Sequence, residues 1–87
     1  MTTSSASVSM VATAYTPLSA GHATVLVHAQ DGPIRVIVAS ELPVVGSDQW
    51  FPIEKGGQLH LESLETTANV YARSDGGTAV ARVIKGP

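Results

Sequence analysis

The chain has 87 residues, which suffices for one domain with a thin core but not for a second domain or a large enclosed active site. Only 14% of the residues are charged, against about 25% in an average soluble domain, and the net charge is −2. This balance argues against nucleic acid or an anionic membrane as the main partner. The absence of cysteine excludes disulfides and thiolate metal sites.

The first nine residues, MTTSSASVS, are small and polar. They bury too little apolar surface to offset the entropy of ordering, so residues 1–9 are expected to form either a frayed tail or an arm that orders against a neighbouring subunit. A strand is expected to begin here, because Val8, Met10, Ala12 and Ala14 alternate with the residues between them. The N-terminus lacks the basic and apolar regions of a signal peptide, which favours synthesis in the cytosol.

Turn signals divide the rest of the chain into short β-branched runs. Thr16-Pro17 breaks the first run, and Ser19–His22 is typical of a turn. Asp31-Gly32 and Asp75–Gly77 are each predicted to close a β-hairpin, because glycine supplies the positive φ that tight turns need. The predicted strands after the first cover residues 23–29, 34–39, 50–53, 58–63, 68–74 and 78–84.

No segment shows a sustained apolar period of 3.6 residues, so the predicted fold class is all-β. Six to seven short strands with closely spaced turns indicate a small antiparallel β-sandwich or barrel. The predicted organisation is a flexible polar N-terminal arm at residues 1–9 and a single β-sandwich domain at residues 10–87.

Residues that could carry chemistry are scattered. His22, His28 and His60 have no metal-ligand spacing, and the sequence contains neither a G-x-S-x-G nucleophile motif nor a glycine-rich phosphate loop. The carboxylates fall mostly in turns or at strand ends, where they solvate the surface; they are Asp31, Glu41, Asp48, Glu54, Glu62, Glu65 and Asp75. The prediction is a protein that is not an enzyme, with no catalytic residues, no metal and no cofactor.

The aromatic residues suggest contact surfaces. Trp50-Phe51-Pro52 is the densest apolar cluster, and it fits either a core plug, an exposed anchor for a neighbouring subunit or a platform for a sugar. Tyr71 and Arg73 are expected on one solvated strand face, with Arg82 opposite them on the partner strand. The candidate interface residues are Val8, Met10, Val11, Trp50, Phe51 and Tyr71.

A polar, Ser/Thr-rich start precedes the run Ala23–Val27, and a Gly-Gly turn leads into Gln58–Leu61. The chain closes with the run Val70–Ser74, the turn Asp75–Gly77 and the run Thr78–Val83. In this organisation it resembles small virion-associated β-sandwich proteins of tailed bacteriophages. That group includes capsid decoration (cement) proteins, head-fibre bases and small tail components. The resemblance transfers no functional residue, because such proteins are defined by shape and assembly.

The resemblance implies a virion structural protein, in the first place a capsid decoration protein made in the bacterial cytoplasm and located in the virion. Its expected partners are the major capsid protein or other virion subunits, and it is expected to form a homo-oligomer without binding nucleic acid or membrane. One alternative is a phage tail or fibre component, or a carbohydrate-binding adhesion module. Another is an accessory β-domain of an enzyme.

Overall fold

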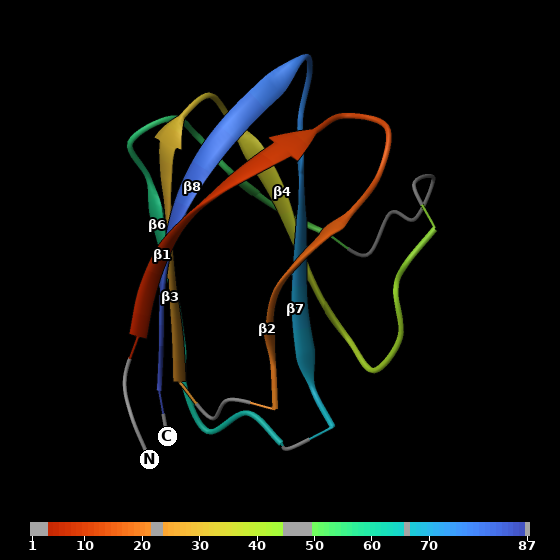
Figure 1. The fold of residues 1–87 in the computed structure, drawn as a ribbon, viewed down its shortest axis with the longest axis vertical. Helices are drawn as coiled ribbons and strands as arrows, with labels where there is room; N and C mark the ends of the chain where they lie inside the picture. Colours follow the sequence, from red (N-terminus) through yellow and green to blue (C-terminus); the bar gives the residue numbers. More distant parts are fainter. Residues whose placement is uncertain (1–3, 22–23, 45–49, 66, 87) are drawn as a thin grey trace.

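The computed structural model describes residues 4–21, 24–44, 50–65 and 67–86, without the side chain of Ser4. This part of the chain forms two four-stranded antiparallel sheets that face each other, which confirms the predicted all-β sandwich (Figure 1). Among the described residues no helix is long and apolar enough to cross a membrane. The strands are β1 (Ser4–Val11), β2 (Thr16–Ala20), β3 (Thr24–Asp31), β4 (Ile34–Ala39), β5 (Phe51–Ile53), β6 (Gln58–Leu61), β7 (Asn69–Ser74) and β8 (Thr78–Gly86).

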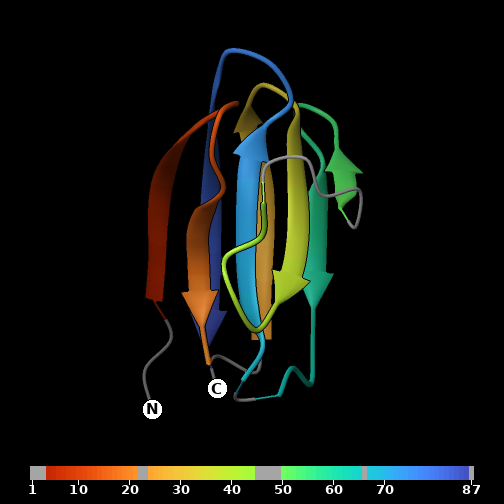
Figure 2. The same cartoon turned by 90° about the vertical axis from the view of Figure 1, so that its right-hand side faces the viewer.

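The pairing of the strands is nested. β1 pairs with β8, β2 with β7, β3 with β6 and β4 with β5. The pairs β3–β8 and β4–β7 complete sheet A, in the order β1-β8-β3-β6, and sheet B, in the order β2-β7-β4-β5. A long antiparallel ribbon folded over into two layers gives this order, which is that of a jelly roll. Edge strands β1 and β2 lie on one lateral side and β5 and β6 on the other (Figure 2).

The two predicted hairpins are wrong. β3 and β4 flank Gly32 but lie in different sheets, and so do β7 and β8 on either side of Gly77. Both glycines have the predicted positive φ, 89° at Gly32 and 68° at Gly77. A glycine reversal lets two strands either pair or separate into two layers. They separate here because each flanking strand contributes its own apolar row to the space between the sheets.

The N-terminal segment is part of the sandwich. Residues 4–9, expected in an arm, belong to β1, which pairs with β8 along its whole length in an unbroken register. The segment joins the sandwich because apolar and polar side chains alternate along β1. Met10 is buried in the core on one face of the strand, and Val8 packs against the core on the same face. These two contacts tie the polar segment to the rest of the fold.

β2 is an eighth strand, beyond the six to seven that were predicted. The sequence Thr16–Ala20 was interpreted as a break followed by a turn, because it contains Pro17. Proline is tolerated in β2 because this strand lies at the edge of sheet B and its register shifts between Pro17 and Ser19. The irregularity leaves Leu18 buried in the core.

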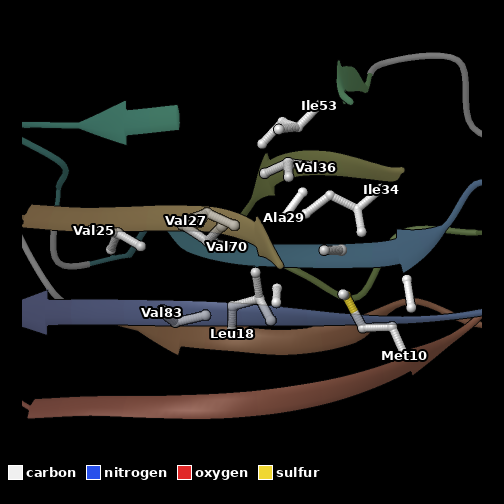
Figure 3. Packing of buried hydrophobic residues seen from close by; sticks show 13 residues of the cluster. Met10, Leu18, Val25, Val27, Ala29, Ile34, Val36, Ile53, Val70 and Val83 are labelled. Carbon is white, nitrogen blue, oxygen red and sulfur yellow. The ribbon is translucent and has the colours of Figure 1, made fainter. Parts of the chain in front are cut away.

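The main core fills the space between the two sheets, and Figure 3 shows its side chains meeting from both layers. Valine dominates it, which suits a narrow interlayer space because β-branched side chains pack well on a pleated surface. Burying each such side chain fully stabilises the fold by about 1.5–3 kcal/mol. The buried members are Met10, Leu18, Val25, Val27, Ala29, Ile34, Val36, Ile53, Val70, Ala72, Ala79, Ala81 and Val83.

Candidate interaction surface

The predicted interface residues divide into two groups. Met10 and Tyr71 are only 1% and 8% exposed, and Val8 is half-buried against the core. These side chains are taken up by the protein's own packing, so Met10 and Tyr71 present no surface to a partner. Val11 and Phe51 are 46% and 62% exposed, and Trp50 is half-buried.

Phe51 points to the side of sheet B that faces sheet A, but the side chains between the sheets do not cover it. Its cross-strand partner on β4 is Val36, which is fully buried in the core. Paired residues in a sheet point to the same face, so Phe51 is directed to the core side of sheet B. Val38, two residues beyond Val36 on the same face, is also 38% exposed. The sandwich therefore leaves apolar surface uncovered at Val38 and Phe51, and the interpretation of Phe51 as a core plug is wrong.

Loop residues 40–44, which follow β4, add further exposed apolar side chains. Leu42 is 63% exposed and Val44 is 74% exposed. The loop is held at its start, where Asn69 Nδ2 donates a hydrogen bond to the carbonyl oxygen of Ser40 at 3.3 Å. Leu42 and Val44 are not among the predicted interface residues, although the sequence carries a signal for them as two aliphatic residues flanking Pro43 in a predicted loop.

We name these exposed side chains the β5 surface. It consists of Val38, Leu42, Val44 and Phe51. The end of β4, the loop at residues 40–44 and β5 lie on the side of the molecule formed by sheet B (Figure 2). Val38 and Phe51 lie on the core side of sheet B, whereas the loop at residues 40–44 runs in front of that sheet, so the exposed side chains form two groups that a partner could cover.

Trp50 precedes Phe51 in the chain, and its ring is contacted by an arginine. The Arg35 guanidinium carbon lies 4.2 Å from the centre of the Trp50 ring, and Arg35 Nε donates a hydrogen bond to Asp75 Oδ1. The ion pair is partly exposed, with 27% of the Arg35 side chain and 41% of the Asp75 side chain accessible. Arg35 thus covers one face of the indole ring and limits stacking on that face.

The outer face of sheet B is not the solvated face that was expected. Tyr15, Ile37 and Tyr71 form a second, smaller core there, and each is less than one-tenth exposed. Arg73 is 9% exposed, with its guanidinium 5.6 Å from the centre of the Tyr15 ring. Arg82, expected opposite this strand, lies on β8 in the other sheet.

The outer face of sheet A is the more polar one. Arg82 Nε donates a hydrogen bond to Gln30 Oε1 at 2.9 Å. An open hollow lies beside it, lined by Ser5, Ala6, Ser7, Arg82 and Ile84. Hydroxyl and guanidinium groups can hydrogen-bond a polar ligand, but the hollow is open to solvent and does not enclose one.

His28 and His60 are the two histidines that the structure describes. His28 lies across from Arg82, and His60 lies on the neighbouring strand β6 with its Nε2 3.6 Å from Glu62 Oε1. Within residues 4–21, 24–44, 50–65 and 67–86 there is no group of three or more His, Cys, Asp or Glu side chains that could hold a metal ion. His22 and Asp48 lie outside the described residues.

The fold and its exposed residues together define a small jelly-roll domain with a candidate protein-contact surface. The sequence matches no protein-family model and no curated protein. Among solved structures, the chain is similar to protein NMB1881 from Neisseria meningitidis, with a TM-score of 0.65 and 15% sequence identity. The similarity covers 98% of this chain and 74% of that chain. At this identity the likeness shows the fold alone.

Proposed function

We propose that this protein is a structural subunit of a bacteriophage virion, and that it acts as a capsid decoration protein. The observation that carries the proposal is the β5 surface, where Leu42, Val44 and Phe51 are all more than three-fifths exposed. Such side chains gain free energy when a partner covers them. The jelly roll is also an architecture used by viral capsid domains, which supports the proposal by analogy.

In this role the protein binds across the boundaries of neighbouring capsid subunits and performs no reaction. A ligand that binds only the assembled shell stabilises the assembled state by mass action, and many bound copies add their contributions. The low charge of the chain suits a surface that is largely covered in the particle. The partners are the major capsid protein and other copies of this chain.

The proposal is tested on virions produced by the bacterial strain that carries the gene. Mass spectrometry of the purified particles is expected to find the protein at many copies per particle, and purified protein is expected to bind heads that lack it until saturation. Saturated heads are expected to resist heating better than bare heads. Particles that contain no such protein, or heads that show no saturable binding, overturn the proposal.

Variants locate the contact on the particle. The double variant Leu42→Ser, Val44→Ser removes apolar surface from the loop and is expected to weaken head binding by about tenfold or more, since tenfold corresponds to only about 1.4 kcal/mol. The matched control is Val11→Ser, which removes an exposed valine from β1, an edge strand of the other sheet. Equal binding by both variants would place the contact elsewhere and remove the β5 surface from the proposal.

A carbohydrate-binding adhesion module, as part of a phage tail or fibre, is the second candidate. It is favoured by the half-exposed Trp50 next to the exposed Phe51, and by the use of the jelly roll in lectins. Trp50 is the single tryptophan of the chain, so its fluorescence reports on any sugar that stacks there. Unchanged Trp50 fluorescence across a glycan panel would count against this candidate.

A further inference from the structure

The four edge strands of the sandwich differ in how they are protected from pairing with another chain. β2 contains Pro17 and a shift in register, and β5 has only three residues, one of them Pro52. β6 has four residues and is followed directly by Glu62. Short strands, prolines, register irregularities and charged residues are the devices by which proteins block edge-to-edge association.

β1 carries none of these devices. Its eight residues, SSASVSMV, contain no proline and no charged side chain. Its register with β8 runs without a shift from Ser4↔Lys85 to Val11↔Thr78. Among the described strands only β8 lies beside it, and Figure 2 shows it as the outermost strand on its side. A row of backbone N–H and C=O groups on its free edge is therefore open to a further strand.

We propose that β1 pairs antiparallel with β1 of a second copy, so that the two A sheets join into one eight-stranded sheet across a two-fold axis. Side chains of paired residues must point to the same face of a continuous sheet, so residues of equal parity pair. If all eight residues of both strands overlapped, each residue would face one of the opposite parity, so this arrangement is excluded. The longest overlap that meets the condition has seven residues. We place the axis at Val8, which sets Val8 against Val8 of the second copy and Ser7 against Ser9 of the second copy.

A second copy fits this edge better than an unrelated strand does. β1 is uncharged, so two copies meet without like-charge repulsion. The self-pairing covers the half-buried Val8 with an identical apolar side chain, and the outward-facing serines are small enough to let the strands approach closely. The isologous contact closes after two copies and does not propagate into a filament.

This contact goes beyond the proposed function, because it can be tested on purified protein without any particle. It lies on the lateral side opposite β5, so a dimer formed through β1 leaves both copies of β5 free for other partners (Figure 2). If the protein dimerises but does not bind heads, the β1 pairing is supported and the proposed function is overturned. If it binds heads as a monomer, the proposed function is supported and the β1 pairing is overturned.

A charge-swap experiment tests the pairing. The double variants Ser7→Lys, Ser9→Lys and Ser7→Glu, Ser9→Glu each place like charges opposite each other twice in the proposed register. Each is expected to raise the Kd of the dimer by about tenfold or more. The two variants mixed in equal amounts are expected to recover a mixed dimer, since each lysine then faces a glutamate. The matched control, Ser7→Thr, Ser9→Thr, keeps a neutral β1 and is expected to dimerise like the wild type.

Sedimentation velocity over a wide concentration range and native mass spectrometry measure the oligomeric state, and circular dichroism confirms that each variant is folded. The mixed dimer also distinguishes lost pairing from lost folding, because unfolded variants would not form a dimer on mixing. A wild-type protein that stays monomeric at all concentrations overturns the proposal. So do charged variants that dimerise as the wild type does, or folded variants that do not recover when mixed.

Discussion

Arg35 on β4 lies directly across from Arg73 on β7 in the register of sheet B. Two like charges in this position ordinarily destabilise a sheet. The two guanidinium groups have different partners: Arg35 donates to Asp75 and stacks on Trp50, whereas Arg73 Nη1 donates to the carbonyl oxygen of Ala12 at 3.1 Å. Of the two, only Arg35 has an ion pair with a described carboxylate.

The buried Arg73 is therefore expected to contribute little through its charge. Its Nε has no hydrogen-bond partner in the described part of the chain, and replacing buried ionic groups by apolar residues of similar size is often neutral or stabilising. We expect Arg73→Met to change the free energy of unfolding by less than about 1 kcal/mol, or to raise it. Arg73→Ala should lower it by about 2 kcal/mol, because truncation also leaves a cavity. Urea denaturation distinguishes the two, and equal losses would contradict this account.

Met10 provides a test of whether β1 is an integral strand. Its side chain is 1% exposed, so Met10→Ala is expected to lower the free energy of unfolding by about 2–5 kcal/mol. The neighbouring substitution Val11→Ala serves as the control, since Val11 is 46% exposed and should cost no more than about 0.5 kcal/mol. Thermal and urea unfolding measure both. A Met10→Ala protein as stable as the control would mean that β1 is an arm outside the cooperative fold.

The fold class could be predicted because it depends on local patterns. Alternation in Gln58–Leu61, the β-branched run at Ile34–Ala39 and the glycine turns each specify strands or reversals within a few residues. The layer to which each strand belongs depends on the packing of strands far apart in the sequence. Gly32 shows the difference: its positive φ was foreseeable, but not that it connects two sheets.

The candidate surface was less predictable for a related reason. Tyr71 and Phe51 are both aromatic residues in predicted strands, and the sequence treats them alike. Tyr71 is buried because Tyr15 and Ile37 cover the outer face of sheet B, whereas Phe51 is exposed because it lies at an edge. Exposure of an apolar side chain is thus decided by which residues of distant segments pack over it, and no local pattern encodes that.

The two tyrosines of the second core should respond differently to removal of their hydroxyl groups. Among the described residues the buried Tyr15 hydroxyl has no hydrogen-bond partner, whereas the Tyr71 hydroxyl accepts a bond of 3.3 Å from Asn69 Nδ2. Tyr15→Phe is expected to leave stability unchanged or raise it, because an unpaired buried hydroxyl is costly. Tyr71→Phe should lower stability by about 0.5–1.5 kcal/mol. Urea denaturation is the measurement, and a larger loss at Tyr15 than at Tyr71 would reverse the assignment.

Three turn glycines form a graded series that tests the two crossings between the sheets. Gly32 has a φ of 89°, and a Cβ placed there would lie 3.3 Å from the Cβ of Ala79. Gly77 has a φ of 68° but no atom within 4 Å of an added Cβ, and Gly76 has open space without a positive φ. Substitution by alanine is therefore expected to destabilise the protein most at Gly32. At Gly77 the loss should be about 1–2 kcal/mol, from backbone strain alone, and at Gly76 stability should hardly change.

The comparison is made by thermal unfolding of the three single variants. Gly32→Ala should give the lowest midpoint, because relief of the contact with Ala79 requires the start of β8 to shift. Gly76→Ala is the internal control, since it adds the same methyl group in the same turn as Gly77 without the backbone strain. If Gly76→Ala destabilised the protein as much as Gly77→Ala, the loss would come from the added methyl group and not from the left-handed backbone at the crossing.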